Sequence, residues 1–293
     1  MTDSSQPVLA SGTFTLAADG ADPVTVRRLG FGAMRITGPG IWGDPPDRDT
    51  AIAVLRRAVE LGVDFVDTAD SYGPFVSEDL IREALHPYDG LLIATKGGFT
   101  RQGPDQWDVV GRPAYLRQCV QMSLRRLGVE RIDLWQLHRI DPNTPAEDQF
   151  GVIADMQREG LIRHVGLSEV SVNDVIAARE HFDVVSVQNL YNVGTRSSEE
   201  LLRFSESEGI GFIPWFPLGN RALLGDDSPV AAVAARLGAT PGQVALAWLL
   251  RHSPVMLPIP GTGSLVHLEE NCASAVLELD DATMAELDRL AIG

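Results

Sequence analysis

The chain has 293 residues, of which 44% are hydrophobic and 22% are charged. This balance is typical of globular proteins and excludes disordered and fibrous classes. Its 40 acidic residues outnumber its 24 basic ones, for a formal charge of -16, and a surface this acidic disfavours nucleic acid and anionic membranes as partners.

Eight short apolar runs follow a predicted β-hairpin along the chain. The hairpin pairs residues 13–16 with residues 24–29 across a turn that contains Asp-Gly. The runs are rich in Val, Ile, Leu and Phe and too short for helices, as buried parallel strands are. They are residues 29–34, 64–69, 91–98, 132–138, 164–170, 184–192, 210–218 and 255–261.

Helical patterns separate these runs. Residues 113–128 begin with Pro and end with Gly, and residues 144–160 open with Thr144 as the expected cap, followed by Pro145 and Glu147. The other predicted helices are residues 50–62, 171–180, 197–209, 240–250, 265–273 and 280–291.

Strands that alternate with helices eight times predict an α/β fold, a closed (β/α)8 TIM barrel. We expect one domain over residues 1–293, with the N-terminal hairpin as a plug at one end and helix 280–291 as an extra C-terminal element. Residues 99–111 and 219–229 are long enough to be functional loops.

The sequence also predicts a cytoplasmic protein. Its two cysteines, Cys119 and Cys272, lie far apart, which argues against a disulfide framework and fits a reducing compartment. The start, MTDSSQPVLASG, has neither the basic nor the apolar region of a signal peptide. No apolar run approaches the ~20 residues of a membrane span.

One lysine, Lys96, stands against 23 arginines and ends a predicted strand. A chain that uses Arg almost everywhere could keep one Lys for its compact ammonium and adjustable pKa, although chance is the alternative. Since active sites of such barrels lie at the C-terminal ends of the strands, we expect Lys96 to meet Asp67, Tyr72 and His138. Taken singly, Asp67 could cap a helix, and Tyr72 and His138 could be packing residues.

Together these four groups could move a proton. The Lys96 ammonium should lower the pKa of the Tyr72 phenol from about 10, and Asp67 should hold the cation in place. His138 could donate to a carbonyl oxygen or orient it. The set predicts protonation of an oxygen that is gaining charge, as in carbonyl reduction, and we predict no metal site.

Here the sequence resembles the aldo-keto reductases over nearly its whole length. The motifs that carry the resemblance are DTADSYG, ATKGG, WQLH, GLSE, VQNLYN, PWFPLG and IPGTGSLVHLEEN. The resemblance implies that Asp67, Tyr72, Lys96 and His138 form the catalytic tetrad of a carbonyl-reducing oxidoreductase, with Tyr72 as the general acid. The segments FGAMRITGPGIWGDPPDR and PIPGTGSLVHLEENCA are similar to bacterial members close to pyridoxal reductases, so pyridoxal or another ring aldehyde or ketone is a candidate substrate.

The resemblance also implies NADP(H), bound extended across the rim of the barrel. Ser168 and Gln188 would hydrogen-bond the nicotinamide carboxamide, and Trp215 would stack on the nicotinamide ring. Glu270 and Asn271 would read the adenine. The residues expected at the phosphates are Leu218, Gly219, Arg221, Gly261, Thr262, Gly263, Ser264 and His267.

Three positions depart from the family pattern. Glu169 stands where many members have Asn, so it can accept a bond from the carboxamide but cannot donate one. The best-studied branch binds the 2′-phosphate with a Lys in the segment that here reads PIPGTG and with an Arg where His267 stands. Thr262, Ser264, His267 and Arg221 could still hold that phosphate, so we expect a preference for NADPH over NADH.

The substrate pocket is expected to be apolar and aromatic, which suits a ring aldehyde or ketone. Arg139, beside His138, could meet an anionic substituent, but we expect it to form a surface ion pair instead. The predicted lining residues are Met34, Trp42, Phe75, Phe99, Trp107 and Tyr191.

Two other classes of protein stay open. Lys96 at a strand end could form a Schiff base, as in a class I aldolase, although the cofactor motifs argue against it. The chain could also be a non-catalytic NADP(H)-sensing subunit, like the potassium-channel β-subunits, although the acidic surface and the lack of a docking extension disfavour this. The sequence does not indicate an oligomeric state.

Overall fold

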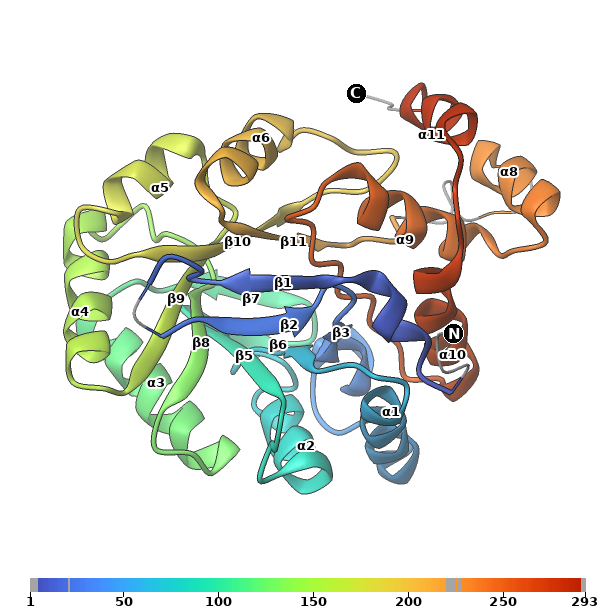
Figure 1. Cartoon of the computed structure of the whole chain (residues 1–293). Helices are drawn as coiled ribbons and strands as arrows, with labels where there is room; N and C mark the ends of the chain where they lie inside the picture. Colours follow the sequence, from blue (N-terminus) through green and yellow to red (C-terminus); the bar gives the residue numbers. More distant parts are fainter. Residues whose placement is uncertain (1–4, 21, 220–224, 226–227, 291–293) are drawn as a thin grey trace.

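The computed structural model describes residues 5–20, 22–219, 225 and 228–290. At its centre a parallel sheet of seven strands curls around on itself, with helices on its outer face (Figure 1). The strands lie in the order β11-β10-β9-β8-β5-β4-β3. Their bounds are β3 Phe31–Gly32, β4 Phe65–Asp67, β5 Leu92–Gly97, β8 Ile132–Leu137, β9 Ile162–Ser168, β10 Val184–Leu190 and β11 Gly211–Trp215.

The eighth predicted strand, residues 255–261, closes the ring without forming a regular strand. On one side its backbone exchanges hydrogen bonds with Phe212 of β11, and on the other side Gly32 of β3 donates to the carbonyl of Pro260. Pro258 and Pro260 have no N–H to donate, so a regular ladder cannot form along this segment. The predicted α/β barrel is confirmed, with a proline-interrupted eighth position.

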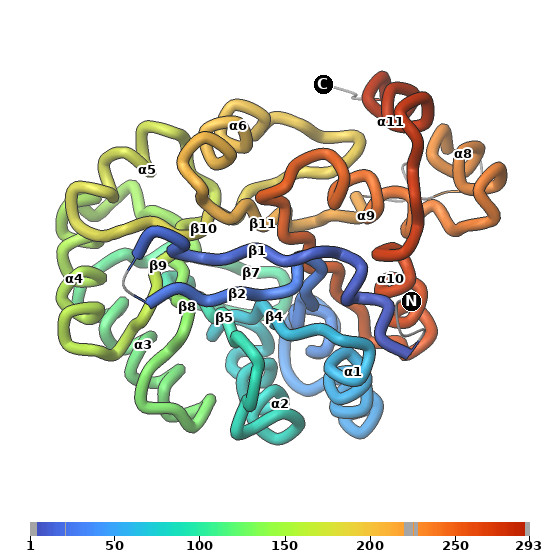
Figure 2. Tube along the Cα trace, viewed as in Figure 1, coloured from blue at the N-terminus to red at the C-terminus, as the bar shows by residue number. Residues whose placement is uncertain are grey.

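The N-terminal hairpin covers the end of the barrel where the strands begin. Strands β1 (Thr13–Leu16) and β2 (Val24–Arg27) pair antiparallel and cross the sheet in front (Figure 2). Leu16 packs with the apolar side chains inside the barrel, and Gly211, the first residue of β11, lies so close to Leu16 that an added Cβ would come within 3.2 Å of it. The plug leaves the opposite end, where the strands finish, for a site.

Helices pack around the sheet, and α10 returns to lie beside α1 at the seam (Figure 2). Two of the α-helices in the described part of the chain were not predicted, α2 and α8. In α2 the buried face includes Ser77 and Glu78, so polar side chains interrupt the apolar period that would reveal a helix. The bounds are α1 Arg48–Glu60, α2 Val76–Leu85, α3 Pro113–Leu127, α4 Ala146–Arg158, α5 Val172–Ala178, α6 Glu199–Glu208, α8 Pro229–Leu237, α9 Pro241–His252, α10 Leu265–Ala273 and α11 Asp281–Asp288.

Two local predictions need correction. Helix α4 begins without a side-chain cap, because the hydroxyl of Thr144 donates to Asp141 instead. Residues 99–111 form mostly a second hairpin, β6 (Phe99–Gly103) with β7 (Gln106–Val109), rather than an irregular loop. Most of the predicted loop 219–229 lies outside the described residues.

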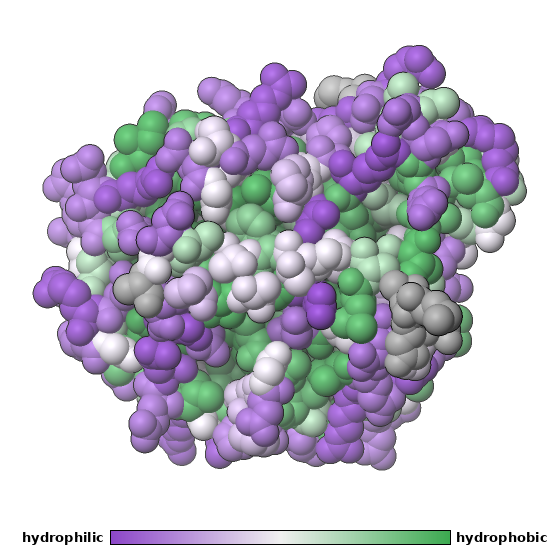
Figure 3. Space-filling view, viewed as in Figure 1, coloured by the Kyte–Doolittle hydropathy of each residue, from purple (hydrophilic) through white to green (hydrophobic). Residues whose placement is uncertain are grey.

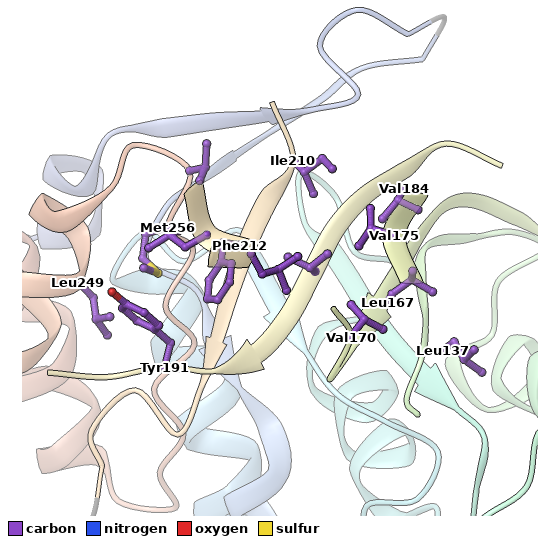
Figure 4. Packing of buried hydrophobic residues seen from close by; sticks show 14 of the residues in the cluster. Leu137, Leu167, Val170, Val175, Val184, Tyr191, Ile210, Phe212, Leu249 and Met256 are labelled. Carbon is purple, nitrogen blue, oxygen red and sulfur yellow. The ribbon is translucent and has the colours of Figure 1, made fainter. Parts of the chain in front are cut away.

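Tyr191 belongs to the core and not to the substrate pocket, so that prediction is wrong. Its side chain is fully buried among apolar residues that include Phe212, Leu249 and Met256 (Figure 4). Its hydroxyl donates to Glu199 between the sheet and the outer helices. The aromatic ring therefore faces away from the interior of the barrel.

The face shown in Figure 3 is largely hydrophilic, with apolar side chains scattered among the charged ones. Among the described helices, none is alone long and apolar enough to cross a membrane. Helices α8 and α9 meet that criterion only as a pair bent by 91°.

Candidate active site

A buried lysine–aspartate pair lies at the open end of the barrel. Lys96, near the end of β5, is fully buried, and its Nζ donates to Asp67 Oδ2 at 2.6 Å and to the carbonyl of Thr68 at 2.7 Å. Asp67 Oδ1 accepts hydrogen bonds of 3.0 Å from the Nε2 atoms of Gln136 and Gln188. Both carboxylate oxygens are thus occupied, which is what a buried charge requires.

Gln136 was missed by sequence reasoning. It lies in β8 directly beside Lys96 of β5, and it is fully buried. A polar residue inside the apolar run 132–138 was the signal that could have pointed to it.

Opposing effects act on the pKa of Lys96. Burial alone would lower that pKa, but the charge of Asp67 and the proximity of Tyr72 outweigh it, so the pKa of Lys96 lies above its ordinary value. Lys96 is therefore a permanent cation at neutral pH.

Tyr72 lies over this pair, with the centroid of its ring 5.3 Å from Lys96 Nζ. Burial raises the pKa of the phenol above its ordinary value, and the opposing attraction of Lys96 does not cancel that rise. We expected Lys96 to lower this pKa below about 10, and for the protein alone the direction is the reverse, because the phenolate loses more hydration than the single cation returns.

His138 completes the predicted group of four. It is buried, its ring centroid lies 6.0 Å from that of Tyr72, and its Nδ1 lies 3.4 Å from the hydroxyl of Ser71. Burial, together with the charges of Lys96 and nearby arginines, lowers the pKa of His138 well below its ordinary value. The imidazole is neutral at neutral pH and keeps one N–H to donate.

Three of the residues predicted to line the substrate pocket, Phe99, Trp107 and Trp42, lie near Tyr72 and His138, and two of them contact these residues through their rings. The ring of Phe99 lies 4.6 Å from that of His138, and the ring of Trp107 lies 6.4 Å from those of both Tyr72 and His138. Trp42 pairs through its backbone with Gly73, one residue beyond Tyr72, and remains 36% exposed. These rings form a wall beside the tetrad.

Two further predicted lining residues lie differently. Phe75 packs under the guanidinium of Arg126, 4.2 Å from ring centroid to Cζ. Arg126 belongs to α3 and binds the buried Glu78 of α2, so the ring of Phe75 contacts the outer helix layer. Met34 lies half-buried in the short helical turn after β3.

The side chain of Arg101 hydrogen-bonds to three loop segments at this end of the barrel. All five of its N–H groups donate to backbone carbonyls, those of Gly40, Ile41, Ser71, Gly103 and Gln106. Its Cζ also lies 3.5 Å from the ring centroid of Trp107. Because Ser71 precedes Tyr72, one guanidinium connects the β6–β7 hairpin to the segment that carries the phenol.

The residues predicted to hold nicotinamide follow one another around the rim. Ser168 ends β9, Gln188 lies in β10 and Trp215 ends β11, and these three strands are neighbours. Trp215 Nε1 donates to Glu169 Oε1 at 2.6 Å, and the same oxygen accepts from the amide of Leu190 at 2.8 Å. Glu169 therefore anchors the indole that was expected to stack on the cofactor.

The segment predicted to bind the phosphates, residues 261–267, continues the arc of predicted cofactor residues that begins with Ser168, Gln188 and Trp215 at the rim of the barrel. Gly261 lies so close to β3 that an added Cβ would come within 2.5 Å of the carbonyl of Gly32, so only glycine fits there. The hydroxyl of Thr262 accepts from the amide of Ser264, and the hydroxyl of Ser264 caps α10 by accepting from the amide of His267.

The remaining predicted cofactor residues lie on or near this arc. Gly263, His267 and the half-buried Glu270 are accessible at the start of α10 and along it, whereas Asn271 is buried. Leu218 and Gly219 follow β11 and are half-buried. Arg221 lies outside the described residues.

No group of three or more His, Cys, Asp or Glu side chains in the described part of the chain could hold a metal ion.

The comparison with known proteins gives the family. The model of the aldo/keto reductase family matches residues 28–292, so the chain belongs to that family and is an oxidoreductase. It is 44% identical to pyridoxine 4-dehydrogenase of Escherichia coli, over 96% of this chain and 98% of that protein. It is 56% identical to an uncharacterized oxidoreductase of Schizosaccharomyces pombe, over 90% of this chain and 87% of that protein.

A solved structure shares the fold. An aldo-keto reductase from Klebsiella pneumoniae, determined with NADPH, superposes with a TM-score of 0.80 over 95% of each chain at 24% identity.

Proposed function

We propose that this protein is an NADP(H)-dependent carbonyl reductase in which Tyr72 is the general acid. The observation that carries the proposal is the buried, charged Lys96 held by Asp67 and Thr68 beneath a phenol whose ring lies beside those of Trp107 and His138. This arrangement would stabilise a phenolate just where a proton must leave.

The residues present fit a dinucleotide. Ser168, Gln188 and Trp215 offer hydroxyl, amide and indole groups along adjacent strand ends, and the closely packed Gly261 leads to the capped start of α10. The arc is therefore polar and aromatic at one end and suited to a phosphate at the other. The solved Klebsiella pneumoniae relative contains NADPH, which agrees with this assignment.

The reaction needs one hydride and one proton. NADPH, when bound, supplies the hydride to the carbonyl carbon. Tyr72 donates its proton to the oxygen, and Lys96 stabilises the phenolate that remains. Neutral His138 donates a hydrogen bond to the same oxygen and so fixes its direction. The raised pKa of Tyr72 keeps the phenol protonated until charge develops on the substrate.

The other two classes of protein fit the geometry less well. A Schiff-base lysine must be a neutral, accessible amine, whereas Lys96 is fully buried and bound to Asp67. Borohydride should therefore not trap a carbonyl compound on Lys96. A cofactor-sensing subunit would need no pair of polar groups able to act on one carbonyl, yet the rings of Tyr72 and His138 lie together with centroids 6.0 Å apart.

Pyridoxal is the substrate we propose to test first, because one relative is a pyridoxine 4-dehydrogenase and aromatic rings lie beside Tyr72 and His138. Initial rates should be measured for pyridoxal, benzaldehyde and a small aliphatic aldehyde, with NADPH and with NADH. We expect pyridoxal to give the highest kcat/KM and NADPH the lower KM. If pyridoxal is reduced no better than benzaldehyde, the proposed substrate is wrong. If kcat/KM is equal with NADPH and NADH, the proposed preference for NADPH is wrong.

A further inference from the structure

Two arginines lie against the aromatic rings beside Tyr72 and His138, Arg101 on Trp107 and Arg139 near Phe99, and they differ in how their donors are used. Arg101 has every N–H bonded to a backbone carbonyl, so it has none left for a ligand. Arg139, the residue after His138, is half-buried and is bonded through one nitrogen only. Its Nη1 donates to the carbonyl of His138 at 2.6 Å and to the hydroxyl of Ser168 at 2.8 Å.

The rest of the Arg139 guanidinium is unpaired within the described part of the chain. Its Nε and Nη2 donate no hydrogen bond and form no ion pair there, so the surface ion pair that we expected from the sequence does not form. The carboxylate of Glu169 attracts it, but Oε1 of Glu169 already accepts from Trp215 and Leu190.

Arg139 lies among the aromatic rings beside His138. Its Cζ lies 5.8 Å from the ring centroid of Phe99, whose ring in turn packs against His138. Its positive charge opposes the rise that burial causes in the pKa of Tyr72 and adds to the fall that burial causes in the pKa of His138. Arg139 is therefore a cation beside the position that a carbonyl substrate would occupy.

We infer that Arg139 binds an anionic group of the substrate, a carboxylate or a phenolate carried on the ring that bears the reacting carbonyl. This inference rests on the proposed reductase function. A half-buried guanidinium with unused donors is incompletely solvated, and an oxyanion that accepts from it forms a charge-assisted, two-point contact. The site then contains three cations, Lys96, Arg101 and Arg139, in a chain whose formal charge is -16. The net charge would not draw an anion toward the protein, so its binding would depend on short-range contacts with these cations.

Two aldehydes of nearly equal size test the inference. They are 4-carboxybenzaldehyde, an anion at neutral pH, and methyl 4-formylbenzoate, its neutral ester. With NADPH, the wild type should give a kcat/KM about tenfold or more higher for the anion. The substitution Arg139→Gln should reduce that ratio about tenfold or more, and Arg139→Lys should preserve part of it, because the charge remains while the planar fork is lost. A ratio at or below one in the wild type, or an unchanged ratio in Arg139→Gln, would overturn the inference.

A binding measurement keeps this result separate from the reductase proposal. Benzoate binding can be followed by calorimetry without any turnover, and its Kd should rise about tenfold in Arg139→Gln. Arg112→Gln, a change of an exposed arginine at the start of α3, should leave the Kd as in the wild type. If the wild type reduces neither these two aldehydes nor any of the panel of pyridoxal, benzaldehyde and an aliphatic aldehyde, the proposed function fails, while the benzoate titration still decides the role of Arg139: equal Kd values for wild type and Arg139→Gln would refute it.

Discussion

Lys96 is the residue around which the site is built. Its ammonium is fully buried and donates to one carboxylate oxygen and one carbonyl, while Tyr72 lies over it. A guanidinium is broader, cannot be placed on the same two acceptors without moving them, and stays charged at any pH. The single lysine in a chain with 23 arginines is thus explained by the shape of this position.

The substitution Lys96→Arg should accordingly keep the fold and lose most turnover. We expect kcat to fall about 100-fold or more, because the phenol loses the charge positioned beneath it. Steady-state kinetics and a thermal melt check this together. A kcat close to the wild type would show that the position accepts any cation.

Asp70, two residues before Tyr72, provides a test of pH dependence. Its carboxyl is fully buried, and burial, followed by the charge of Glu78, raises its pKa to about 7 from the model-compound value of 3.8. Because the folded state then holds the proton more tightly than the unfolded state, Asp70 costs no stability below about pH 4. It lowers the free energy of unfolding progressively as the pH rises from about 4 to 7.

The substitution Asp70→Asn removes this titration. The difference in the free energy of unfolding, variant minus wild type, should therefore grow by roughly 2 to 3 kcal/mol from pH 5 to pH 8. Urea unfolding of both proteins at the two pH values measures the difference. A stability difference that is the same at pH 5 and pH 8 would show that Asp70 does not titrate in this range.

At the scale of elements, the β6–β7 hairpin is attached to the rest of the rim by Arg101. Five backbone carbonyls from three segments meet one guanidinium, and the amide of Asp105 at the hairpin tip donates to Gly40 at 2.9 Å. Lysine has three donors and no plane to lie on Trp107, so it could not replace these contacts.

The substitution Arg101→Lys should loosen the hairpin and displace Trp107 from Tyr72. We expect kcat/KM to fall about 10- to 100-fold for ring aldehydes and hydrogen exchange of the Asp105 amide to become faster. Arg112→Lys, at an exposed position just beyond the hairpin, is the matched control. Unchanged exchange and unchanged kinetics in Arg101→Lys would mean that the hairpin holds itself in place.

The elements also show where sequence patterns suffice and where they do not. The seven regular strands and the hairpin plug were predictable because apolar runs and turn residues mark them. Helix α2 was not, because Ser77 and Glu78 on its buried face bind Thr68 and Thr95 of neighbouring elements. The segment 255–261 was predicted as a strand, but Pro258 and Pro260 limit its pairing.

For the molecule as a whole, the sequence motifs predict the same group of four residues that the fold places side by side. Asp67, Lys96, Tyr72 and His138 could be predicted as a group because strand ends meet at one end of a barrel. The direction of the pKa shift of Tyr72 could not, since it depends on how completely the phenol is buried. Phe75 and Tyr191 were misplaced for a related reason: the sequence shows that a residue is aromatic but not which way its ring points.

The chain therefore places a buried ammonium, a phenol and an imidazole beside aromatic rings at the open end of an acidic barrel whose other end is plugged. In this account the phenol of Tyr72 is the only proton donor to the carbonyl oxygen. Lys96 stabilises the phenolate, His138 orients the carbonyl, and Arg139 binds an anionic group of the substrate.

The measurement that tests this most directly is the turnover of Tyr72→Phe with its NADPH affinity measured in parallel. Phenylalanine keeps the ring and removes only the hydroxyl, so Kd for NADPH, followed by fluorescence titration, should stay within about threefold of the wild type. We predict that kcat for aldehyde reduction falls by about 1,000-fold or more. A Tyr72→Phe enzyme that binds NADPH normally and reduces aldehydes at a rate near that of the wild type would contradict the account.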